Sequence, residues 1–145
     1  MRKQYISPRF GVLEYDADDA IRFGKGLLGM PQYGAFILHD APDTAPIRWL
    51  IGMDGGPELT LINPAVLGPE YSLDDIRVDD RLLAELHCRD PRDLERYAII
   101  TVPKDIRRIS MNLRTPVLIN REARRGRSTG VPRELFPSNI RLSVT

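Results

Sequence analysis

The chain of 145 residues carries 21 basic and 20 acidic residues, and 42% of its residues are hydrophobic. This length and composition are typical of one globular domain and exclude a wholly disordered chain. The single cysteine, Cys88, excludes an intramolecular disulfide and a cysteine-only zinc site, so we expect a reducing, cytoplasmic environment. The N-terminus lacks an apolar targeting segment, and apolar stretches such as residues 97–102 are far shorter than the roughly 20 residues of a membrane helix.

Short apolar segments separated by turn residues run along the whole chain. Its 12 prolines and 11 glycines interrupt it at short intervals, which leaves little room for long helices. We predict strands over residues 11–15, 20–23, 35–38, 47–53, 59–62, 97–102, 109–113 and 116–120. Because exposed strand edges favour aggregation, these strands must pair or close. The sequence therefore predicts an all-β, mainly antiparallel, small β-barrel-like single domain.

One α-helix is predicted over residues 78–86. Its leucines fall on one face, and Asp79 or Asp80 is positioned to cap its N-terminus. A second short helical turn is expected at Asp90-Pro91, because proline fits the first position of a helix. Trp49 lies within an apolar segment and is expected in the core. Residues 140–144 alternate between apolar and polar, which is compatible with an added strand or with an unpaired tail.

Charge is divided unevenly along the chain. Residues 1–100 have a net charge of −6, and residues 101–145 have a net charge of +7. This division is compatible with an anionic partner for the basic end, with attraction between the two halves, or with a solvated tail. Arg121, Arg124, Arg125 and Arg127 could neutralise phosphates, but no aromatic residues are interleaved with them to stack on bases. A solvated basic hairpin or tail is favoured over a nucleic-acid surface.

Residues for catalysis or for cofactor binding are not evident. His39, His87 and Cys88 show no metal-ligand spacing, and no serine lies in a G-x-S-x-G frame. Residues 24–29 read G-x-G-x-x-G, but Pro31 follows at once where a dinucleotide site needs a helix, so turn glycines are expected. We therefore expect no catalytic residues, no metal and no cofactor, and a protein that acts by binding.

Three collinear motifs resemble those of a known family. Residues 21–30 (IRFGKGLLGM) are close to I-x-F-x-x-G-L-P-G-F, with Leu28 in place of proline and Met30 in place of an aromatic. Residues 61–64 (LINP), followed by 69–71 (PEY), match an N/D-P and P-D/E-Y element. The last third contains I-L-T-V-P-like and N-L-x-A-P-I-x-I-N-like segments at residues 99–103 (IITVP) and 111–120 (MNLRTPVLIN), with a basic turn ending at Gly126. In this order and spacing, they resemble the FliW family of flagellar assembly factors.

The resemblance implies a non-enzymatic cytoplasmic protein with a small β-barrel-like fold. Members of this family bind flagellin before its export and also bind the RNA-binding translational repressor CsrA. Export of flagellin frees the factor to sequester CsrA, so that flagellin translation rises, and no direct nucleic-acid contact is expected. An acidic body suits a basic RNA-binding partner. The alternative is a nucleic-acid-binding module that uses the C-terminal arginines.

The resemblance covers residues 1–127, which we expect to form the barrel domain, with residues 128–145 as an extension that adds a strand or stays a mobile tail. Candidate partner-binding residues lie after the central strand and on the late strand. They are Asn63, Pro64, Tyr71, Met111, Asn112 and Leu113. Aromatic residues, methionine and rigid prolines bury contact area with little loss of entropy. The alternative is a core position for Met111 and Leu113 and turn geometry for Asn63-Pro64.

Overall fold

The computed structural model describes residues 2–27, 31–53, 55–102, 104–130 and 140–141. Strands account for most of the regular structure in these residues, with one α-helix, α1 (Asp80–Glu85), and several 3-10 turns. The strands are β1 (Arg2–Ser7), β2 (Gly11–Asp16), β3 (Ile21–Arg22), β4 (Ala35–Asp40), β5 (Arg48–Gly52), β6 (Glu58–Ile62), β7 (Glu95–Thr101), β8 (Ser110–Asn120), β9 (Arg125–Ser128) and β10 (Ile140–Arg141).

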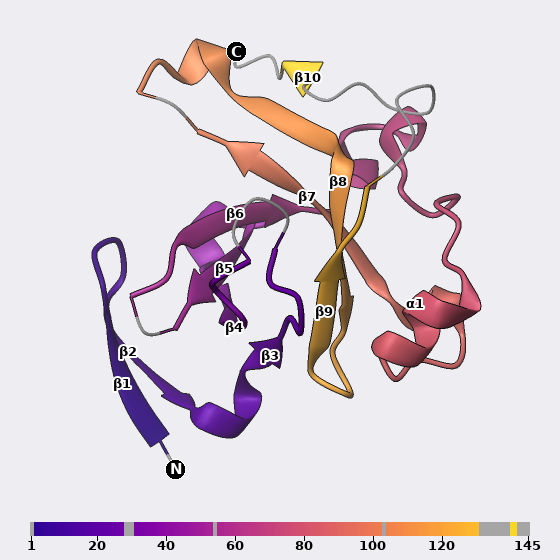
Figure 1. Cartoon of the computed structure of the whole chain (residues 1–145). Helices are drawn as coiled ribbons and strands as arrows, with labels where there is room; N and C mark the ends of the chain where they lie inside the picture. Colours follow the sequence, from indigo (N-terminus) through magenta and orange to yellow (C-terminus); the bar gives the residue numbers. More distant parts are fainter. Residues whose placement is uncertain (1, 28–30, 54, 103, 131–139, 142–145) are drawn as a thin grey trace.

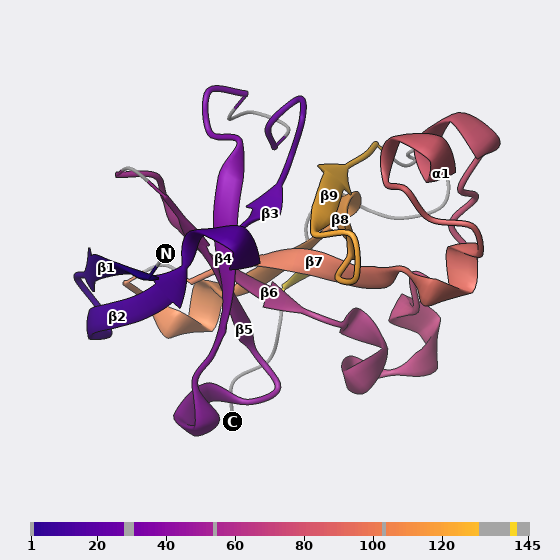
Figure 2. The same ribbon diagram turned by 90° about the horizontal axis from the view of Figure 1, so that it is seen from below.

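Seven of these strands close into a barrel (Figure 1 and Figure 2). The ring runs β3-β4-β5-β6-β7-β8-β9 and returns to β3. Neighbours are antiparallel except β9 and β3, which are parallel and are joined by a hydrogen bond of 3.0 Å from the Arg22 N–H to the Arg124 carbonyl. The predicted fold class, an all-β barrel-like domain with one or two short helices, is confirmed.

The barrel interior is filled by side chains that alternate along the strands. These are Ile21, Phe23, Leu27, Phe36, Leu50, Leu61, Tyr97, Val117 and Ile119. The rings of Phe23 and Phe36 meet edge to face, with centroids 5.4 Å apart. Gly126 of β9 lies directly against the Phe23 ring, and a Cβ at this position would overlap it. A glycine is therefore needed where β9 closes the barrel.

The connection between β6 and β7 forms a second layer outside the barrel. Its first part, residues 63–79, is called the outer loop here, and it contains the 3-10 turns η3 (Pro64–Leu67) and η4 (Pro69–Tyr71). The outer loop packs apolar side chains on the outward face of β6, β7 and β8. This second cluster consists of Ile62, Leu73, Ile76, Ala98, Ile100, Met111 and Leu113. The outer loop and α1 lie on the side of the barrel away from β1 and β2 (Figure 2).

The helix predicted over residues 78–86 is present as α1. The Asp79 carboxylate accepts a hydrogen bond of 2.9 Å from the Leu82 N–H and caps the first turn. Leu86 follows the helix and packs into a third apolar cluster on the outside of β8. The expected second turn is also present, as η5 (Pro91–Asp93), which is capped by Asp90.

β1 and β2 form a separate hairpin beside the barrel (Figure 1). The Ser7 hydroxyl donates a hydrogen bond of 2.5 Å to the Glu58 carboxylate. The ring of Phe10 meets that of Trp49 edge to face, with centroids 5.1 Å apart. These contacts fasten the hairpin turn to β5 and β6. Trp49 is buried, as predicted.

β8 is a single strand where the sequence predicted two. Its register against β7 shifts between the pairs Tyr97–Val117 and Ile99–Asn112, so several residues of β8 bulge opposite one residue of β7. The Asn112 side chain spans the bulge. It accepts a hydrogen bond of 2.9 Å from the Arg114 N–H and donates one of 2.9 Å to the Thr115 hydroxyl. The bulge lets β8 bend and continue through Pro116.

The C-terminal part of the chain differs from expectation at one strand. Residues 125–128, read as part of a basic turn and tail, form β9 and pair with β8. Farther on, Ile140 and Arg141 pair with Met111 and Ser110 of β8. The other positions between 131 and 145, like the expected departures at Leu28 and Met30, lie outside the described residues. The division of the chain after residue 127 remains a prediction.

Candidate partner-binding surface

Three of the predicted binding residues lie together on the outer loop. The Asn63 side chain accepts a hydrogen bond of 3.1 Å from the Ala65 N–H and so caps η3. Pro64 is buried at the first position of that turn, and Tyr71 is half-buried against the second apolar cluster. Asn63 is exposed. The turn geometry weighed for Asn63-Pro64 is thus present, while Asn63 and one side of Tyr71 remain accessible to a partner.

The other three predicted residues lie on β8 and serve mainly to build it. Met111 and Leu113 are 0% exposed in the second apolar cluster. These two side chains therefore occupy the core position named as the alternative, and their role in partner binding stays a prediction. Asn112 is half-buried and spans the β8 bulge. The structure does not join this trio to the outer loop as one exposed site.

Two exposed apolar residues of the outer loop were not predicted from the sequence. Val66 is 56% exposed and Leu67 is 42% exposed, and both lie on η3. Gly68, with φ of 149°, separates η3 from η4 at a backbone conformation that favours glycine. The sequence feature that could have indicated their exposure is the position of Val66-Leu67 immediately before Gly-Pro. An apolar pair there lies in a turn and not in a strand.

The outer loop that carries this apolar pair is rich in carboxylates. Glu70, Asp74, Asp75 and Asp79 are exposed, and Arg77 is the single basic residue among residues 63–79. The outer loop therefore carries a net charge of −3 as well as two exposed apolar side chains. We call Val66, Leu67 and these four carboxylates the acidic surface. Exposed apolar side chains in a polar, charged setting are compatible with a protein-binding patch.

A pocket of about 350 Å³ adjoins the acidic surface where the outer loop meets the barrel. Asn63, Val66 and Asp74 line it from the loop, and Arg48 and Arg96 are among the residues that line it from the strands. The side chains that line it carry charges of both signs. The pocket is large enough to take one side chain of a partner, and charged or polar groups make up about half of its lining.

A network of charged groups closes this end of the barrel. The Arg48 guanidinium donates to the Asp40 carboxylate at 2.6 and 2.7 Å, to Glu95 at 3.0 Å and to the Tyr97 hydroxyl at 2.7 Å. Arg121 donates two further bonds of 2.7 Å to Glu95. Five side chains from β4, β5, β7 and the end of β8 are thereby joined. Such a satisfied network rigidifies the strand ends that support the outer loop.

The pKa values of these groups follow from the network. Burial raises the pKa of Glu95, but hydrogen bonds from Arg121 and Tyr97 outweigh it, so the net shift is below the ordinary value. The hydrogen bond from Arg48 lowers the pKa of Asp40. Burial and the hydrogen bond to Glu95 raise the pKa of Tyr97. Both carboxylates are therefore ionised at neutral pH and act as structural anions.

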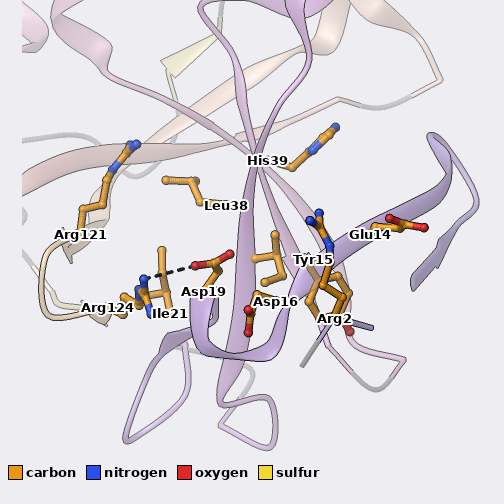
Figure 3. Close-up of a pocket in the computed structure, with 11 residues that line it drawn as sticks. Arg2, Glu14, Tyr15, Asp16, Asp19, Ile21, Leu38, His39, Arg121 and Arg124 are labelled. Atoms are coloured by element: carbon orange, nitrogen blue, oxygen red, sulfur yellow. Dashed lines mark ion pairs between the residues drawn. The ribbon is translucent and has the colours of Figure 1, made fainter. Parts of the chain in front are cut away.

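A second, larger pocket of about 610 Å³ lies between the β1–β2 hairpin, β4 and the turn after β8 (Figure 3). Ile21 and Leu38 form its apolar floor, and charged side chains of both signs surround it. Across the pocket edge, Arg124 pairs with Asp19 at 3.2 Å. The lining contains three basic and three acidic side chains, so its formal charges sum to zero.

The basic cluster is largely neutralised by the acidic half of the chain. Arg121 pairs with Glu95 at 2.7 Å, Arg124 with Asp19 at 3.2 Å, and Arg127 with Glu85 at 2.5 Å. Of the three explanations left open for the charge division, attraction between the halves is the one that the structure shows. These arginines project from the β8–β9 hairpin toward partners within the chain.

The residues weighed for catalysis and cofactors have local structural surroundings. His39 meets Phe10 edge to face at 4.7 Å, and the Cys88 thiol donates to the Asp90 carbonyl at 3.1 Å. Gly26 adopts a φ of 66°, as expected for a turn glycine, whereas Gly24 does not. Within the described part of the chain, no group of three or more potential ligands is placed to hold a metal. Over the same residues, no helix has the length and apolar character needed to cross a membrane.

Comparison with known proteins gives a consistent result over nearly the whole chain. The family model described as FliW protein matches residues 4–129. Flagellar assembly factors FliW from Alkaliphilus metalliredigens and Moorella thermoacetica are 30% and 33% identical, over 88% and 85% of this chain and 78% and 77% of theirs. The crystal structure of a flagellar assembly factor FliW superposes with a TM-score of 0.84 at 25% identity, covering 99% of both chains. The chain therefore belongs to the FliW family of flagellar assembly factors.

Proposed function

We propose that this protein binds flagellin and, in alternation, the translational repressor CsrA, in the cytoplasm and without catalysis. Flagellin occupies the factor until it is exported, and the freed factor then sequesters CsrA. Translation of flagellin rises as the repressor is withdrawn. The protein thereby couples synthesis of the filament subunit to assembly of the flagellum. Family membership supports this proposal.

The acidic surface is the observation that carries the proposal for CsrA. An RNA-binding protein presents basic residues, and a loop of net charge −3 that exposes Val66 and Leu67 complements them. Charge complementarity speeds encounter and fixes orientation, whereas the apolar pair supplies area that is desolvated on binding. Asn63 and Tyr71, proposed as contacts from the sequence, lie on the same loop.

The nucleic-acid alternative has less support, because three of its four arginines form ion pairs within the chain. A nucleic acid would have to displace Glu95, Asp19 and Glu85 before it gained these contacts. Deletion of the arginine stretch is not a usable test, since it removes β9 and opens the barrel. Titration of RNA at two salt concentrations is the appropriate test, because phosphate contacts give a steep salt dependence.

Calorimetric titration with purified flagellin and, separately, with CsrA tests the proposal. Binding of both by the unmodified protein is expected, and absence of binding to either at tens of micromolar would overturn it. The double variant Val66→Ser/Leu67→Ser should weaken CsrA binding by about tenfold or more, since about 1.4 kcal/mol is a factor of ten. The matched control is Ile6→Ser/Val12→Ser, because this apolar pair is even more exposed, at 78% and 62%, but lies on the β1–β2 hairpin. Equal losses in both double variants would show that the acidic surface is not the contact.

A further inference from the structure

One side chain of the barrel wall joins two segments of the outer layer. Arg96 lies on β7, and its Nη1 donates to the carbonyls of Leu73, Asp74 and Ile76 at 2.9, 3.1 and 3.2 Å. Its Nη2 donates 2.9 Å in a different direction, to the carbonyl of Pro91. All four acceptors are backbone groups outside the barrel. Arg96 thus hydrogen-bonds to the end of the outer loop through one nitrogen and to the turn η5 through the other.

The chemistry of these bonds requires a guanidinium. Two nitrogens in one rigid plane donate in separate directions, and hydrogen bonds from a charged donor are roughly twice as strong as those between neutral groups. A lysine ammonium presents one nitrogen and cannot reach both segments from the same position. The apolar contacts of Leu73 and Ile76 hold the loop on the barrel but are not directional. The hydrogen bonds of Arg96 are directional and therefore fix the orientation of the loop on the barrel.

Arg96 is also close to the acidic surface. It lines the 350 Å³ pocket together with Val66 and Asp74, one member of the apolar pair and one of the four carboxylates. The backbone of Asp74 is itself one of the groups that Arg96 holds. The guanidinium therefore fixes part of the loop that carries the acidic surface.

We propose that Arg96 is a positioning residue that holds the outer loop in the arrangement with which the acidic surface binds its basic protein partner. This inference rests on the proposed function, because it names what sets the geometry of the CsrA-binding surface. Arg96 acts on the partner through the loop that it holds. Its loss leaves the carboxylates in place but lets the loop that carries them move, so each complex forms as readily and separates sooner.

The test uses Arg96→Met, which keeps the aliphatic stem, and Arg96→Lys, which keeps the charge. Hydrogen exchange of the free variants should show at least tenfold faster exchange of amides in residues 64–79, with unchanged rates in β4 and β5. Binding kinetics measured on a surface with immobilised CsrA should show a dissociation rate that is raised at least tenfold for Arg96→Met. The increase should be smaller for Arg96→Lys. The association rate should not fall, because no acidic charge is lost. The control is Arg92→Met on η5, because this side chain is 89% exposed and forms an ion pair with Asp90 of the same turn.

The outcomes separate the inference from the function on which it rests. If Arg96→Met only lowered the stability of the protein, a smaller fraction of molecules would bind CsrA but the dissociation rate would not change. This result would overturn the positioning role. Unchanged loop exchange in Arg96→Met would overturn it as well. If the unmodified protein does not bind CsrA, the proposed function fails, and the partner-binding role of Arg96 fails with it. The exchange measurement would then still decide whether Arg96 holds the loop.

Discussion

Gly126→Ala is the most direct perturbation of barrel closure. An added Cβ would lie 2.6 Å from Cε2 and 2.8 Å from Cε1 of Phe23, whereas carbon atoms in contact normally lie about 3.5–4.0 Å apart. The ring would have to move by about 1 Å, against Phe36, whose ring meets it edge to face. Gly126 is not among the glycines with a positive φ, so the backbone itself accepts alanine.

The expected cost follows from these contacts. Overpacking of a well-packed core costs about 1–3 kcal/mol. Replacing glycine by alanine returns about 0.4–1 kcal/mol, because the unfolded chain has fewer conformations to lose. The net loss in free energy of unfolding is therefore about 1–2 kcal/mol. With a urea dependence of about 1.5 kcal/mol per molar, the unfolding midpoint should fall by about 1 M.

Urea unfolding followed by the fluorescence of the buried Trp49 measures this change. Gly130→Ala is the matched control, because nothing lies within 4 Å of a Cβ there, and its midpoint should equal or slightly exceed that of the unmodified protein. Phe23→Leu should relieve the clash, so the double variant should be more stable than the sum of the single effects predicts. An unchanged midpoint for Gly126→Ala, or strictly additive effects, would refute the reasoning.

Three further predictions address the binding surface and the charge network. Met111→Ala should lower the free energy of unfolding by about 2–5 kcal/mol, measured by urea unfolding, and leave the affinity of the folded protein for CsrA unchanged, because the side chain is in the core. Since the pKa of Glu95 is lower in the folded state, its contribution to stability is present above the ordinary pKa and is lost as the pH falls through the folded value. Thermal unfolding between pH 6 and about 3 should therefore show a shallower loss of stability in Glu95→Gln, and a parallel curve would contradict this. Asn112→Ala should destabilise by about 1–3 kcal/mol through the unpaired groups of the β8 bulge, as judged by the same unfolding measurement.

Strands with an apolar pattern could be predicted from the sequence, and those without one could not. The segments of β4, β5 and β6 face the core on at least one side and carry the apolar residues that such burial requires. β1 is charged and largely exposed, because it pairs with a single neighbour outside the barrel. β9 reads Arg-Gly-Arg-Ser, and its inward positions are Gly126 and Ser128. Its place in the barrel depends on the Phe23 ring opposite, which no local pattern reveals.

The candidate surface was only partly predictable for a related reason. A motif marks positions where a residue type is required, but Asn63 and Asn112 satisfy that requirement by capping a turn and by spanning a bulge. Met111 has the composition of an interface anchor and of a core residue alike, and only the covering loop decides between them. Val66 and Leu67 resemble core residues in sequence. Their exposure became evident only from the course of the outer loop.

The parallel pairing of β3 with β9 has a consequence for when the protein first becomes active. The ring is completed by residues that are about 100 positions apart, Arg22 and Arg125, so closure must await a contact of high sequence separation. During synthesis, β4 to β8 can pair as they emerge, but their curved sheet keeps an open edge until residues 125–128 have been made. A chain interrupted before that point would contain every residue of the acidic surface and lack the closed support beneath it. A newly made molecule can therefore complete its fold only when the last quarter of the chain has been synthesised and the barrel has closed.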